Sequence, residues 1–112
     1  MLSKDQRLKK KKDFDLVFKK GSGLKESFLI LKFQPGQFKK SRFGIVVSQK
    51  VSKKAVVRNK IKRRLRALIR QAEPQFKKRV DVVIITLPGI EKKDWQEIKK
   101  TVGDLFQKAK LI

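Results

Sequence analysis

The chain has 112 residues, of which 32 are Lys or Arg and 10 are Asp or Glu, so its formal net charge is +22. It contains no Cys and no His, which excludes disulfides, thiolate zinc sites and catalysis that depends on an imidazole. The length fits one domain, residues 1–112, and eight Phe argue against full disorder. A charge of this size favours a polyanionic partner, with nucleic acid as the leading candidate.

No apolar run approaches the length of a membrane-spanning helix, and no apolar segment follows the basic N-terminus as it would in a signal peptide. We therefore expect no membrane partner and a cytoplasmic location. Residues 1–12 are polar and basic, and we expect them to be irregular. Their cations either contact phosphate or are solvated, and the sequence leaves both interpretations open.

Residues 13–20, DFDLVFKK, predict a short helix with Asp13 as its N-cap and Gly21 just beyond its end. Phe14, Val17 and Phe18 share one face of this helix. Such a face typically packs on a core. Two Phe on one side of a short helix can instead stack on a nucleobase, so both interpretations stay open.

Two β-rich segments follow, at 27–34 and 42–48. The connection between them contains Pro35-Gly36 and has the length of a hairpin loop, which predicts that the two strands are antiparallel neighbours. Gly44 lies in the middle of the second strand. A Gly at such a position often marks the close approach of another backbone or of a ligand.

Residues 55–72 predict a helix with two distinct faces. The apolar stripe, at helical spacing, consists of Val57, Ile61, Leu65, Leu68 and Ala72. The adjoining sector, which carries five cations, one amide and no carboxylate, consists of Arg58, Asn59, Lys62, Arg63, Arg66 and Arg70. Like-charge pairs four residues apart each cost a few tenths of a kcal/mol, so this face indicates an anionic partner, although a charge run in isolation is usually a solvated face. Asn59 is either an ordinary surface residue or a donor and acceptor amid the cations.

Residues 79–87, RVDVVIITL, predict a central strand that is parallel to the strand before the basic helix. A last helix at 94–109 has Asp94 as its N-cap and Glu97 in a capping box, and the tail beyond it leaves room for a short edge strand. The predicted fold is an α+β single-domain sandwich in the order αββαβα, with helices on a small mixed sheet.

The carboxylates are scattered along the chain and form no metal-ligand cluster, and no nucleophile has a candidate base. We therefore expect no catalytic site and no metal site in the polypeptide itself.

The stretch 55–66, AVVRNKIKRRLR, closely resembles the RNR signature of the bacterial ribonuclease P protein subunit. The resemblance extends, in order, to RLKK at 7–10, DF at 13–14, VFKKG at 17–21, RFGIVVS at 42–48 and DVVII at 81–85. Two departures are Gln49, where the family often has Lys, and the brief tail after Phe106.

The resemblance implies a protein that assists a catalytic RNA in removing the 5′ leader from precursor tRNA, with hydrolysis performed by the RNA and its Mg²⁺. It implies contacts with the catalytic RNA from Arg58, Asn59, Lys62, Arg63 and Arg66, and we expect the neighbouring cations Lys53, Lys54 and Arg70 to take part in the same contact. It implies a leader-binding cleft formed by Phe14, Phe18, Phe33, Val46, Ser48 and Lys50. It also implies a left-handed crossover around the basic helix, in place of the usual right-handed one. The alternative is a structural RNA-binding protein, such as a ribosomal protein, which would not affect cleavage; no DNA partner is expected.

Overall fold

A computed structural model gives the fold and describes residues 7–8, 11–36 and 41–112. The α-helices and strands of this part of the chain are α1 (Lys11–Lys20), β1 (Ser22–Glu26), β2 (Leu29–Pro35), β3 (Arg42–Val46), α2 (Ala55–Ala72), β4 (Val80–Thr86) and α3 (Trp95–Lys108). Two short 3₁₀ turns, η2 (Glu73–Gln75) and η3 (Ile90–Lys92), follow α2 and β4. The α+β class with a small mixed sheet is thus confirmed. No helix within the described ranges is long and apolar enough to cross a membrane.

The four strands form one sheet in the order β1-β2-β4-β3. β2 is antiparallel to both β1 and β4, whereas β3 is parallel to β4 as predicted. The predicted hairpin between 27–34 and 42–48 is wrong, because β4 lies between β2 and β3. The physical reason is burial. β4 is the most continuously apolar strand, and only a central position in the sheet buries the side chains on both of its faces.

The sequence interpretation missed β1, which pairs with β2 through a turn at Ser27, where φ is 50°. Leu24 is the one apolar side chain in this edge strand, so the sequence lacks the alternation of apolar and polar residues that would predict a strand here. The final strand for which the tail left room does not form, since residues 111–112 lie outside any strand. The predicted left-handed crossover remains a prediction.

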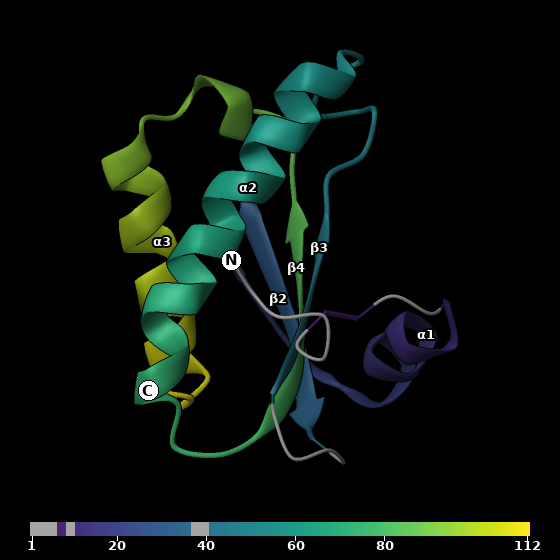
Figure 1. The fold of residues 1–112 in the computed structure, drawn as a ribbon, viewed down its shortest axis with the longest axis vertical. Coiled ribbons are helices and arrows are strands. Elements are labelled where there is room, and N and C mark those ends of the chain that lie inside the picture. The colour runs from purple at the N-terminus through teal and green to yellow at the C-terminus, as the bar shows by residue number, and fades with distance from the viewer. Residues whose placement is uncertain (1–6, 9–10, 37–40) are drawn as a thin grey trace.

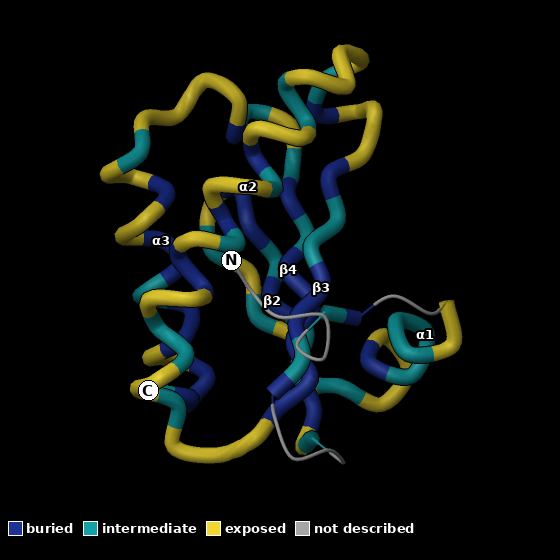
Figure 2. Tube along the Cα trace, in the orientation of Figure 1, coloured by how far each residue is buried: buried dark blue, intermediate teal, exposed yellow. Residues whose placement is uncertain are grey.

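Helices cover both faces of the sheet (Figure 1). α2 and α3 lie on one face over the main core, which includes Phe43, Val82 and Ile84. α1 lies on the other face, where Leu8, Val17 and Val83 form a second, smaller cluster. Figure 2 shows the buried strands between the helices and the exposed outer turns of α2.

The predicted two-faced helix is confirmed in α2. Ile61, Leu65 and Leu68 are buried, and Val57 and Ala72 pack partly against the same core. Ile69, which the sequence interpretation did not assign to the stripe, is fully buried. The helix therefore has a wide apolar stripe on the sheet and leaves its cationic sector outside.

The end helices begin differently from one another. In α3, the Asp94 side chain accepts a hydrogen bond from the Glu97 N–H at 2.9 Å, as the predicted N-cap requires. α1 begins at Lys11 rather than after Asp13, so Asp13 lies in its first turn and is not the N-cap. Lys11 and Lys12, which belong to the segment expected to be irregular, are therefore helical. Residues 1–6, 9 and 10 of that segment lie outside the described residues.

Candidate nucleic-acid interface

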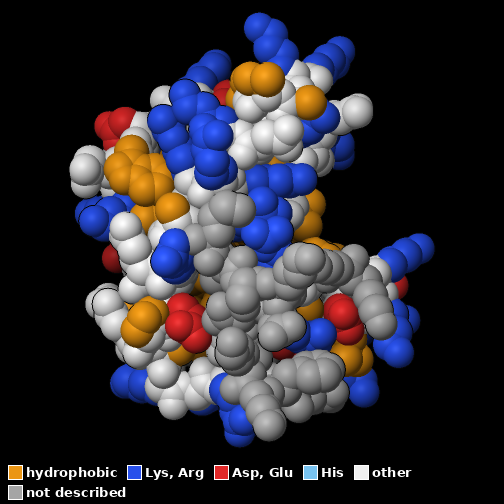
Figure 3. Space-filling model, viewed as in Figure 1, with side chains coloured by type: hydrophobic (Ala, Val, Ile, Leu, Met, Phe, Trp, Pro, Cys, Tyr) orange, Lys and Arg blue, Asp and Glu red, His pale blue; other side chains and the backbone are white. Residues whose placement is uncertain are grey.

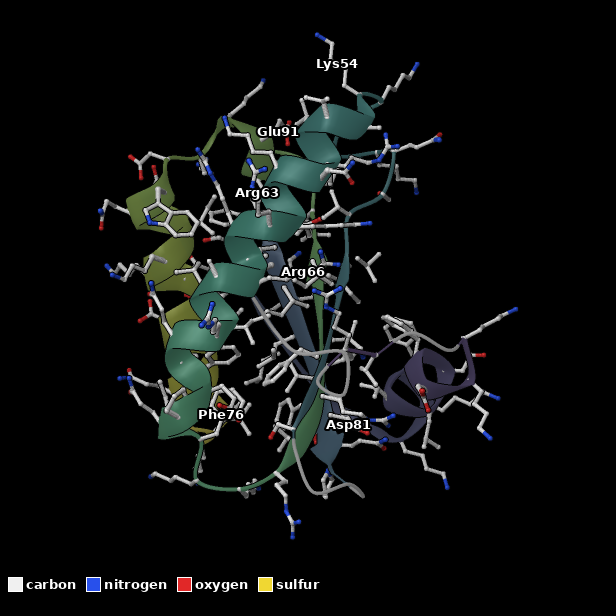
Figure 4. The ribbon with its side chains drawn as sticks, in the orientation of Figure 1. Lys54, Arg63, Arg66, Phe76, Asp81 and Glu91 are labelled. Carbon is white, nitrogen blue, oxygen red and sulfur yellow. The ribbon has the colours of Figure 1, made fainter. Side chains whose placement is uncertain are left out.

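The cationic sector of α2 forms one continuous surface. A depression of about 700 Å³ lies on it, lined in the described part of the chain by Asn59, Lys62, Arg63, Arg66, Ala67, Arg70 and Gln71. Lys and Arg side chains gather over α2 in Figure 3, and Figure 4 shows Arg63 and Arg66 on this helix. Five of the residues predicted to contact the catalytic RNA are thus brought together.

Arg58 differs from the other cations of this sector. It is half-buried, and its Nη1 donates to the backbone oxygen of Ser52 at 2.9 Å. This contact fastens the loop before α2 to the first turn of the helix. Arg58 therefore has a structural contact in addition to any contact with a partner.

Lys53 and Lys54 are exposed immediately before α2. Lys54 is the N-cap, but no side chain caps the helix there, and the first turn contains no acidic residue. The positive end of the helix dipole therefore adds to these two ammonium groups. This end of α2 favours an anion, in line with the predicted contacts.

Phe14 packs closely on the sheet because residue 44 is Gly. A Cβ atom at Gly44 would lie 2.5 Å from Phe14 Cε1, closer than real Cβ contacts allow. The close approach predicted at this Gly is therefore made by an aromatic ring of the same chain. Phe18, whose ring centroid is 6.4 Å from that of Phe14, is 39% exposed and remains open to a partner.

An ion cluster that the sequence interpretation missed fixes α1 to the sheet. Arg42 on β3 contacts Asp81 on β4 twice, with Nε to Oδ1 at 3.1 Å and Nη2 to Oδ2 at 2.8 Å. Its Nη1 reaches Asp13 on α1 at 3.4 Å. The hydrogen bonds that Arg42 donates to Asp81, together with the charges of both carboxylates, raise the pKa of Arg42, so the guanidinium stays charged. A signal existed: Asp81 is an acid inside an apolar strand, and a buried carboxylate needs a partner.

Among the remaining predicted leader-binding residues, Phe33 is separated from Val46 by the sheet. Val46 is half-buried on the α1 face, beside the cluster that Phe14 joins. Ser48 and Lys50 are exposed after β3, where the Lys50 N–H donates to Ser48 Oγ at 3.3 Å. Phe33 instead packs on the main core, on the opposite face of the sheet from Val46. In Figure 3 the molecular outline is hollowed on the β3 side, between the start of α2 and α1.

Comparison with known proteins shows which family has this fold and this basic helix. The family model described as Ribonuclease P matches residues 2–110. The chain belongs to the ribonuclease P protein family. A ribonuclease P protein component from Synechocystis is 43% identical over 112 residues, covering 99% of this chain and 90% of the relative.

Solved ribonuclease P proteins share the fold. One from Staphylococcus aureus, a mutant with defective mRNA degradation activity, superposes with a TM-score of 0.90 at 26% identity and covers 97% of this chain and 92% of its own. One from Thermotoga maritima, in complex with 1-(4-fluorophenyl)-2-thiourea, gives 0.81 at 31% identity and covers 88% and 95%. The resemblance to the ribonuclease P family seen in the sequence is therefore confirmed, together with the fold.

Proposed function

We propose that this chain is the protein subunit of an RNA-based endonuclease that removes the 5′ leader from precursor tRNA in the cytoplasm. The observation that carries the proposal is the cationic sector of α2, which has no acid and lies outward on a helix whose other side is fully packed. Membership of the ribonuclease P family supports it. The partners are the catalytic RNA and the precursor tRNA.

The catalytic RNA contacts the start and the cationic sector of α2. The proposed contact residues are Lys53, Lys54, Arg58, Asn59, Lys62, Arg63, Arg66 and Arg70. Guanidinium groups bind phosphate through two parallel hydrogen bonds, and Asn59 supplies both a donor and an acceptor. These contacts hold the protein on the RNA.

The leader lies on the other side of β3, along the surface formed by Phe14, Phe18, Val46, Ser48 and Lys50. Exposed aromatic rings accept bases of any sequence by stacking, which suits a leader whose sequence varies. We leave Phe33 out of this surface because it packs toward α2 and α3.

Within the described residues, no group of three or more Asp or Glu could hold a metal ion. We propose that the Mg²⁺ used in hydrolysis is held by the RNA, as the family resemblance implies. The polypeptide then binds and orients the RNA partners, and its side chains take no part in the chemical step.

The experiment that tests the proposal is cleavage of a precursor tRNA by a bacterial ribonuclease P RNA at low magnesium, with and without the protein. We expect the protein to stimulate cleavage and to leave the 5′ end at the mature position. Tight binding to the RNA without stimulation would contradict the proposal and favour a structural RNA-binding protein. Cleavage by the protein in the absence of the RNA would contradict the assignment of hydrolysis to the RNA.

Phe18→Ala should weaken binding of precursor tRNA by the holoenzyme and leave mature tRNA binding unchanged. Loss of one base stack costs about 1–3 kcal/mol, and the exposed ring contributes little to the core. Affinities for the two tRNAs measure the effect. Phe18→Leu is the matched variant: it retains apolar bulk without the ring, so full leader affinity in Phe18→Leu would show that stacking is not the interaction.

A further inference from the structure

A small pocket of about 200 Å³ lies at the β3 edge, where the N-terminal segment and α1 approach α2. Its described lining consists of Arg7, Leu8, Phe14, Phe43, Gly44, Ile45 and Arg66. Two guanidinium side chains thus line it from distant parts of the chain, and no carboxylate is among these residues. The pocket is positively charged with aromatic walls.

Arg7 is held in place by its backbone. It forms a parallel bridge with Phe43, and the N–H of Leu8 donates to the Phe43 oxygen at 2.8 Å. Its Nε atom is buried and has no hydrogen-bond partner among the residues that the structure describes. Buried donors are nearly always paired in folded proteins, so the Nε–H group of Arg7 is an unusual feature of this pocket.

Arg66 connects this pocket with the depression on α2, because it lines both. In the view of Figure 4, Arg66 lies at the edge of α2 that is nearer to β3. Phe14, in turn, belongs to the surface assigned to the leader. The pocket therefore lies at the junction of the two proposed RNA surfaces.

We propose that Arg7 and Arg66 bind one phosphodiester of the 5′ leader in this pocket. The inference rests on the proposed function and deepens it. The two planar guanidinium groups that line the pocket, with no carboxylate among its described lining residues, match the two free oxygens of a phosphodiester. The leader is the strand concerned, because Phe14 forms a wall of the pocket and stacks the neighbouring base.

Methylphosphonate scanning of the leader tests this assignment. Each leader linkage is made neutral in turn, and affinities for the holoenzyme are measured with the native protein and with Arg7→Gln. In the native complex, one linkage should stand out with a loss of about ten-fold, the size expected of one charged contact. With Arg7→Gln, the affinity of the holoenzyme for the unmodified precursor should already be lower by about the same factor. Neutralising that linkage should then cause no further loss of affinity.

Two further variants serve as references. Arg7→Lys keeps the charge without the planar fork and should recover only part of the affinity. Lys100→Gln removes one exposed cation on α3 and should leave the scan unchanged. Arg7→Gln should fold normally, as circular dichroism and the melting temperature would show, because the backbone bridge of Arg7 with Phe43 does not depend on the side chain.

The outcomes separate the two proposals. If native protein does not distinguish precursor from mature tRNA, the proposed function fails. If it does, but Arg7→Gln and the neutral linkage lower affinity independently, the pocket assignment is overturned. An Arg7→Gln variant that loses equal affinity for precursor and mature tRNA would also overturn it, since the phosphodiester would then not belong to the leader.

Discussion

Arg42→Met should lower the free energy of unfolding by about 3–5 kcal/mol, because it leaves the Asp81 carboxylate buried and unpaired. The side chain of Asp81 is only 2% exposed, and Arg42 supplies both of the guanidinium contacts that compensate its charge. Urea unfolding followed by circular dichroism measures the loss.

Two variants make the interpretation specific. Arg42→Met combined with Asp81→Leu removes both charges and should be more stable than Arg42→Met alone. Arg79→Met removes an exposed cation next to β4 and should change stability by no more than about 0.5 kcal/mol. Equal destabilisation by Arg42→Met and Arg79→Met would show that the ion cluster does not stabilise the fold.

A second large effect is expected on assembly with the catalytic RNA. Lys62→Gln combined with Arg63→Gln should weaken binding by about 2–4 kcal/mol, because two phosphate contacts are lost from the α2 surface. The slope of log affinity against log salt should become shallower by about two. Filter binding over a range of salt concentrations measures both quantities.

The neighbouring residue gives a matched control. Arg64 has the same charge and lies on the same helix, but its guanidinium lies 5.8 Å from the centroid of the Trp95 ring, on the α3 side. Arg64→Gln should therefore retain both affinity and salt slope far better than Arg63→Gln. Equal losses would mean that the RNA responds to total charge and not to one face of α2.

The helices could be predicted from the sequence because their signals are local. The apolar spacing in α2 and the Asp94 cap of α3 each lie within a few residues. The sheet could be predicted only in part, since strand order depends on contacts between distant segments. The connection between β2 and β3 has the length of a hairpin loop. The apolar strand β4 nevertheless lies between them, because a central position buries both of its faces.

The candidate site could likewise be predicted where its residues follow a local pattern, and not where it depends on contacts between distant segments. The cationic sector of α2 could be found because its residues repeat along one helix, and the structure places five of them around one depression. The family resemblance implied that Phe33 and Val46 line one cleft, but their register places them on opposite faces of the sheet. The Arg42 cluster joins three separate elements, and the Arg7–Arg66 pocket joins four segments of the chain. A local sequence pattern does not indicate contacts between such distant segments.

The central place of β4 also determines when the sheet can form during synthesis. β2 and β3 are made before β4, and the edges that they present to it stay unpaired until residues 80–86 have left the ribosome. Chains grow at about 5–20 residues per second, so these open edges last for seconds. Unpaired edges invite pairing with other chains. The many cations carried by this part of the chain repel other copies during that interval, so the charge that suits RNA also protects the nascent protein from aggregation.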